Sequence, residues 1–198
     1  MHMLAIALMA LGLAGCDFQI GPAHPERDAR AVLEREGHRP AGIAAIVSGG
    51  PLAAAEVASL RHHRSRDVRF LVARNRHLTS AQVDDFVGDR DDFVRSGAAA
   101  NPGLTAAQTA RLAGDVSHTV RLQLAGNPSL TEGQLLGLHA RQSPGLLAFA
   151  FNPNCPEVIR AEILASDDDL AKRWLEITDG WKRDGHFVRG GDGRWQRP

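Results

Sequence analysis

The sequence Asn101-Pro102-Gly103-Leu104-Thr105 returns further along the chain as Asn127-Pro128-Ser129-Leu130-Thr131. Partial copies flank this pair at nearly the same interval, as Asn75-Arg76-His77-Leu78-Thr79 before it and as Asn152-Pro153-Asn154-Cys155-Pro156 after it. A fixed period in the range of about 20–50 residues is typical of repeat proteins, in which each unit buries its apolar face only against its neighbours. The period therefore predicts a row of similar units along most of the chain.

Apolar side chains recur at the same interval and predict a shared core. The clearest column contains Leu60, Phe86, Leu112, Leu138 and Ile163. Three further columns hold Leu52, Leu78, Leu104, Leu130 and Cys155, then Val57, Val83, Thr109 and Leu135, and then Val68, Val94 and Val120. The positions between the columns vary, so we expect the columns to face the interior.

Local signals within each unit predict where helices begin and end. Thr79, Thr105 and Thr131 are each followed, three positions later, by glutamine at Gln82, Gln108 and Gln134. Thr-x-x-Gln is a capping box, in which the two residues satisfy free backbone N–H groups at a helix start. A proline disfavours helical geometry in the residue before it, so the preceding helix should end at the repeated asparagine. Each unit is predicted to be a helix, a turn, a shorter helix and a turn.

These units resemble those of the leucine-rich repeat variant family, which read approximately Val-Arg-x-x-Leu-Ala-x-Asn-Pro followed by a Leu-x-x-Leu-Ala-x-Asp helix. The best match is Val120-Arg121-Leu122-Gln123-Leu124-Ala125-Gly126-Asn127-Pro128. The resemblance covers approximately positions 44–170. It implies an all-α fold, a right-handed superhelical solenoid of two-helix repeats that alternate α-helices with short or 3₁₀ helices. Some members carry a cysteine-rich iron–sulfur segment; this chain lacks those cysteines, so no cofactor is expected.

The N-terminus resembles a bacterial lipoprotein signal. Positions 4–14 form an uncharged stretch that is too short to span a bilayer, which takes about 20 residues, and that suits a signal peptide. The stretch ends in Leu13-Ala14-Gly15-Cys16, which resembles the lipobox and implies lipidation of Cys16. An ordinary signal peptide, or a buried helix with a chance cysteine, is the alternative. Asp17 resembles an inner-membrane retention signal. We therefore expect a lipid-anchored protein on the periplasmic side of a bacterial cell envelope.

The remaining composition divides the chain into segments. We expect a signal peptide at 1–15, a tether at 16–25, an N-terminal capping helix at 26–43, repeats at 44–175 and a C-terminal cap or tail at 176–198. Within the capping segment, the helix itself is predicted at Glu26–Glu36, with Gly37 as its stop. All three tryptophans follow residue 173, and Gly190-Gly191-Asp192-Gly193 separates two apolar stretches, which predicts a β-hairpin. This end is either a cap over the last unit or a contact patch for a partner that uses Trp181 and Trp195.

A column of arginines is the candidate binding feature of the repeats. Arg69, Arg95 and Arg121 recur with the same period as the asparagines. They would form a basic ladder that grips carboxylates or phosphates of a partner. Alternatively, each pairs with an acidic residue of a neighbouring unit, such as Asp89 or Asp115.

Signals for metal binding and catalysis are sparse. The nine histidines include the adjacent His62 and His63, and also His77, but no His-x-x-x-His or Cys-x-x-Cys spacing occurs, so no metal site is expected. Cys155 fits a small buried hydrophobe. Ser117-His118 and nearby acids do not form a recognisable catalytic motif, so we expect no enzyme.

Charge and repeats together give the expected function. The formal net charge is zero, which gives no reason to expect nucleic acid as a partner. We expect a non-catalytic scaffold or adaptor that binds a protein partner in the cell envelope and reaches the membrane through its lipid anchor. The alternative is an envelope protein that binds a metal or cofactor through surface histidines.

Overall fold

The protein is an all-α fold with one small antiparallel sheet at its C-terminus. The computed structural model describes residues 24–141, 145–196 and 198. Among these residues, no helix combines the length and apolarity needed to cross a bilayer. The elements are α2 (Pro25–Arg35), α3 (Pro40–Ser48), α4 (Ala54–Leu60), α5 (Arg66–Ala73), α6 (Ser80–Val87), α7 (Asp92–Ala99), α8 (Ala106–Ala113), α9 (His118–Ala125), α10 (Glu132–His139), α11 (Leu146–Ala150), α12 (Glu157–Ala165), α13 (Asp169–Arg183), β1 (Val188–Arg189) and β2 (Trp195–Gln196).

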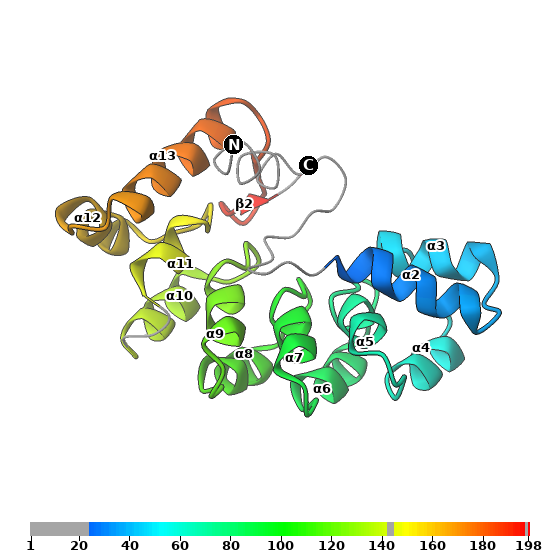
Figure 1. Cartoon of the computed structure of the whole chain (residues 1–198). Coiled ribbons are helices and arrows are strands. Elements are labelled where there is room, and N and C mark those ends of the chain that lie inside the picture. The colour runs from blue at the N-terminus through cyan, green and yellow to red at the C-terminus, as the bar shows by residue number, and fades with distance from the viewer. Residues whose placement is uncertain (1–23, 142–144, 197) are drawn as a thin grey trace.

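The helices form pairs that lie side by side in two layers. In one layer α5 packs against α7, α7 against α9, and α11 against α13; in the other α6 packs against α8, and α8 against α10. Figure 1 shows the pairs following one another along an arc, with α6 and α8 on its outer side. Every pair therefore has a neighbour on each side except at the two ends.

In three units the second helix is at least as long as the first. We expect a short or 3₁₀ helix here, and for these units the expectation is wrong: α5, α7 and α9 are α-helices of eight residues, like α6, α8 and α10. The reason is the spacing along the chain. The residues before these helices, Ser65, Asp91 and Ser117, each lie ten positions before the repeated asparagine, which leaves room for two full turns. The equivalent helix α11, with five residues, is shorter.

The repeated asparagine is the buried link between units. The carboxamide nitrogen Nδ2 of Asn127 donates to the carbonyl oxygens of Ala99 and Asn101, at 2.8 and 3.0 Å. The Oδ1 atom of Asn127 accepts from the Ser129 backbone N–H at 2.9 Å. Asn101 and Asn152 make the same three bonds one unit before and after, and we call this series the asparagine ladder. An amide side chain supplies two donors and an acceptor at once, which explains why asparagine recurs here.

The predicted capping boxes are confirmed. The hydroxyl oxygen of Thr105 accepts from the Gln108 backbone N–H, and the Gln108 side chain accepts from the Thr105 N–H at 3.0 Å. Thr79 and Thr131 start α6 and α10 in the same way. Gln108 also donates through Nε2 to the carbonyl of Ser80 at 2.7 Å, so the cap is tied to the preceding unit.

The predicted core columns lie mostly in the interior. Leu60, Phe86, Leu112, Leu138 and Ile163 are all at most 3% exposed. In the column that starts at Leu52, Leu130 and Cys155 are buried, whereas Leu52, Leu78 and Leu104 are only half-buried and pack against the core. Between α5 and α7, a side chain at Gly97 would lie within 3.0 Å of Phe70, so glycine permits this close approach.

Both ends depart from the boundaries expected from the sequence. The helix expected at Glu26–Glu36 is confirmed as α2, which packs on α5. The rest of the segment 26–43 is not part of this helix and holds the beginning of α3. The boundary after residue 175 falls inside α13, which has 15 residues. Thr178 of α13 occupies the position equivalent to the ladder asparagines. It lacks the carboxamide oxygen that accepts from the N–H two residues further on in the regular units, and α13 continues past it. The predicted hairpin is confirmed, with Val188 opposite Gln196 and Arg189 opposite Trp195.

Candidate functional site

The arginine column faces the next unit along the row. Arg69 is 5% exposed, and its Nε and Nη2 atoms donate to the two carboxylate oxygens of Asp89 at 2.9 and 3.2 Å. Its Nη1 atom donates to the carbonyl of His63 at 2.7 Å. Asp89 also accepts from the Asp91 backbone N–H at 2.9 Å, which shapes the loop before α7. All these partners belong to the protein itself.

Arg95 repeats this arrangement one unit later. Its Nε and Nη2 atoms donate to Asp115 at 2.6 and 2.9 Å, and the hydrogen bond to Asp115 raises the pKa of the guanidinium. Burial alone would raise the pKa of the Asp115 carboxyl, but the bonds from Arg95 and from the Ser117 N–H outweigh it and leave this pKa lowered. Such bidentate pairs are strong and directional. Arg121 continues the column by donating through Nη1 to the carbonyl of Asp115.

Of the two predictions for the arginine column, pairing with acidic residues of a neighbouring unit is confirmed for Arg69 and Arg95. Both guanidinium groups connect consecutive units in the manner of the asparagine ladder. Their hydrogen-bond donors are used within the row of units. A partner could bind these guanidinium groups only by competing with Asp89 and Asp115.

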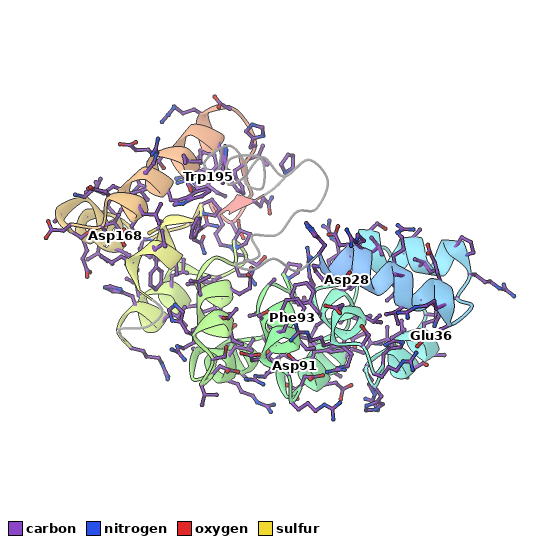
Figure 2. All side chains as sticks on the ribbon, viewed as in Figure 1. Asp28, Glu36, Asp91, Phe93, Asp168 and Trp195 are labelled. Atoms are coloured by element: carbon purple, nitrogen blue, oxygen red, sulfur yellow. The ribbon has the colours of Figure 1, made fainter. Side chains whose placement is uncertain are left out.

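The histidines are distributed over separate sites. The Nε2 atom of His63 lies 2.6 Å from Glu36, just after α2, and its Nδ1 atom accepts from the Ser65 backbone N–H at 3.0 Å. The bond from His63 lowers the pKa of Glu36, which also pairs with Arg64 at 2.9 Å. Figure 2 shows Glu36 at the end of α2 near α4. His63 therefore fastens the first helix to the repeats.

Metal-binding groups and reactive groups do not converge in the described part of the chain. Among residues 24–141, 145–196 and 198, no three His, Cys, Asp or Glu side chains gather closely enough to hold a metal ion. His62 and His77 are exposed. Burial raises the pKa of the Cys155 thiol to about 12, so it stays protonated at neutral pH and is a poor nucleophile. The Ser117 hydroxyl bonds to Asp92 at 2.8 Å.

The two candidate tryptophans lie at the C-terminal end of the row. The ring of Trp181 packs between Trp174 and Phe187, with centroids 6.2 and 6.3 Å away. The ring of Trp195 lies 5.7 Å from the Lys182 ammonium and 5.4 Å from the Arg189 guanidinium. Figure 2 places Trp195 beside α13, at the opposite end of the arc from Glu36. Trp181 thus packs within the cap, whereas the Trp195 ring lies against cationic side chains of α13 and β1.

The hairpin is bound to two loops of the repeats, which the sequence did not indicate. The Trp195 backbone N–H donates to Oδ1 of Asn154 at 2.7 Å, and Nδ2 of Asn154 donates to the Trp195 carbonyl at 2.8 Å. Nδ2 of Asn154 also reaches the carbonyl of Pro128 at 2.8 Å. Arg194 donates through Nη1 to the carbonyl of Ser129 at 2.6 Å. The equivalent loop position holds serine in one unit and asparagine in the next, and this difference was the only available signal.

A cavity of about 640 Å³ lies beside the docked hairpin. The beginnings of α10 and α12 form one wall, the end of α13 another and the hairpin a third. Arg160 and Lys182, which line the cavity, share the carboxylate of Asp179 at 2.6 and 3.2 Å. Burial would raise the pKa of Asp179, but the bonds from Arg160 and Lys182 lower it. The cavity is therefore polar on the helix side and aromatic at Trp195.

Comparison of the chain with protein-family models, curated proteins and solved structures finds no match. Cys16, the expected lipidation site, lies outside the described residues.

Proposed function

We propose that this protein is a lipid-anchored envelope lipoprotein that works as a non-catalytic scaffold for a protein partner. The observation that supports the scaffold most directly is the row of helix pairs joined by the same side-chain bonds in successive units. Stacked helical units make extended curved surfaces, which many repeat proteins use to bind other proteins. We also infer that the row is a right-handed solenoid of the leucine-rich repeat variant kind, because of its period and its Val-Arg and Asn-Pro motifs.

Exposed apolar side chains favour the C-terminal half of the outer layer as the contact surface. Leu136 on α10 and Val158 and Leu164 on α12 are 36, 62 and 57% exposed. Residues equivalent to Leu164 in earlier units, Val87 and Ala113, are buried. We infer that these three side chains contribute to the contact surface, because contiguous exposed apolar surface marks protein contacts.

Site-specific crosslinking in the native envelope tests the scaffold. A photoreactive amino acid at position 158 or 164 should capture one defined protein, and mass spectrometry would identify it. The matched control is the same probe at Ala55, the position of α4 equivalent to Val158. Equal capture of the same proteins at all three positions, or none at any, contradicts the proposal.

The anchor has its own test. Cys16→Ser should abolish incorporation of a labelled fatty acid and release the protein from washed membranes, because two or more acyl chains are needed for stable attachment. Cys155→Ser is the matched control and should keep both. Unchanged acylation and retention in Cys16→Ser would refute the lipid anchor.

A further inference from the structure

The C-terminal segment occupies the loops at Ser129 and Asn154 in the manner of a bound peptide. Asn154 holds both the N–H and the carbonyl of Trp195, at 2.7 and 2.8 Å. This is the pairing that a neighbouring β-strand would supply, here made by one amide side chain. It recognises extended backbone, whatever side chain the backbone carries.

Two side chains of the segment add recognition of their own. Arg194 reaches the carbonyl of Ser129, one unit away from Asn154, and so spans two loops of the row. The ring of Trp195 lines the cavity together with Arg189 and Lys182. These contacts therefore favour a segment in which an arginine is followed directly by an aromatic residue.

Asn154 makes its loop different from those of the earlier units. The residue two positions after the ladder asparagine is His77, Gly103 or Ser129 in those units. Of these, a glycine has no side chain and a serine has one short hydroxyl, so neither can hold both ends of a peptide unit. The pairing amide occurs where the segment docks.

The docked segment is held by few contacts. Each strand of the hairpin has two residues, and an isolated two-stranded hairpin is marginal in water. Trp195 is only partly buried. Phe187, before β1, is buried against Trp181 and stays with the cap, so only the part of the segment around Trp195 needs to leave the loops.

We propose that the loops at Ser129 and Asn154 form a peptide-binding site, which Arg194 and Trp195 occupy until an extended partner segment with a basic residue before an aromatic one displaces them. The proposal rests on the scaffold function and deepens it by naming the kind of segment bound. The tail then acts as an internal competitor that restricts binding to partners of sufficient affinity.

A displacement experiment on the full chain in detergent tests this. The probe is a fluorescent synthetic peptide with the sequence of residues 184–198, followed by anisotropy. A tethered segment competes at an effective concentration on the order of millimolar, so wild-type chain should bind the probe at least about tenfold more weakly than Arg194→Ala/Trp195→Ala chain. Adding Asn154→Ala to that double variant should remove binding.

Peptide variants keep the test independent of folding, because Asn154 also bonds to Pro128. A probe carrying the Arg194→Ala and Trp195→Ala changes should not bind the double-variant chain, whereas a probe with Val188→Ala should bind it normally. Equal binding to wild-type and double-variant chain, binding to neither, or binding that ignores the peptide changes would overturn the proposal. If the peptide experiment gives one of these results but position 164 still crosslinks to one defined protein, the peptide-binding site is refuted and the scaffold function is not.

Discussion

The regular units and the C-terminal end of the row differ at the ladder position itself. At Asn75, Asn101 and Asn127 the carboxamide oxygen accepts from the backbone N–H two residues further on, and the helix before it has ended. Thr178 has no carboxamide, and α13 continues to Arg183. The hydroxyl of Thr178 still donates to the carbonyl of Ala150 at 2.9 Å, so the last unit is joined to the row by one such bond instead of two. A small change in local chemistry thus converts a repeating unit into an end.

A second column shows how the row stops. Ala73, Ala99, Ala125 and Ala150 are fully buried. The equivalent residue of α13 is Glu176, which is exposed. If another helix packed over this position, the Glu176 carboxylate would lose its hydration, which is costly. The charge is therefore stable at the end of the row and disfavours packing of a further unit. Terminal repeats commonly carry such polar faces.

The largest expected effect compares a buried and an exposed leucine of the outer layer. Leu112→Ala should lower the free energy of unfolding by about 2–5 kcal/mol, because Leu112 is 1% exposed and its loss leaves a cavity between units. Leu164→Ala, at the free end, should change it by less than about 1 kcal/mol. Urea unfolding of both variants decides this, and equal midpoints would show that the core columns are misassigned.

The ion pairs between units should have the next largest effect. Asp115→Asn should cost about 3 kcal/mol because it leaves the largely buried Arg95 without its counter-charge, whereas Asp85→Asn, in an exposed pair with Arg61, should cost less than about 1 kcal/mol. Urea unfolding of the two variants measures both losses. Losses of the same size would show that burial of the Arg95 pair adds nothing to its contribution.

The same pair sets the expected dependence on pH. The pKa of Asp115 is lowered from its ordinary 3.8, so its contribution is present above pH 3.8 and is lost as the pH falls through the lower, folded-state value. The wild type and Asp115→Asn should therefore converge in stability during acid titration. A constant gap down to the acid-unfolded state would contradict this role.

The asparagine ladder is expected to matter more inside the row than at its end. Asn127→Ala leaves the carbonyls of Ala99 and Asn101 without this donor and should cost about 2 kcal/mol. Thr178→Ala removes one shared hydroxyl donor and should cost about 1 kcal/mol. Chemical denaturation gives both values, and the reverse ranking would refute the interpretation of Thr178 as a weakened ladder position.

The smallest expected effect concerns the helix caps. Thr105→Ala removes the hydroxyl that caps α8 and should cost about 1 kcal/mol. α12 follows Pro156 and has no side-chain cap. Pro156→Ala is therefore the control, because it removes no capping hydroxyl and should not show the loss of stability that follows from losing one. Thermal melts monitored by circular dichroism would compare them. An unaltered melt for Thr105→Ala would count against the capping box.

Much of the regular region could be predicted from sequence because its signals are local or periodic. Caps such as Thr105 with Gln108 join residues of one helical turn, and the Leu112 column repeats visibly. The length of α5 was not predicted, because no Thr-x-x-Gln box marks where this helix begins, and its first residue follows Ser65, whose side chain makes no cap bond. The shared period also allowed the pairing of Arg95 with Asp115 to be named as an alternative. The partners of Asn127 could not be predicted, because they are backbone carbonyls of the adjacent unit.

The C-terminal site was predicted least well. The tryptophans indicated a special end, but Asn154 is 41 residues from Trp195, and nothing periodic connects them. Docking of the hairpin depends on one asparagine in place of the serine found one unit earlier. From the sequence alone, one asparagine in place of a serine does not predict that the tail docks there. Its role is evident only when the loop and the tail are placed side by side in the structure.

The central claim is that each unit is stabilised by contact with the next copy along the row, and duplication of one unit tests it most directly. Residues 101–126 would be inserted again after residue 126, with a duplicate of residues 101–113 as the out-of-register control. The full duplicate should unfold cooperatively with a urea midpoint at or above that of the wild type, while the half duplicate should be strongly destabilised. Equal destabilisation of both insertions would contradict it.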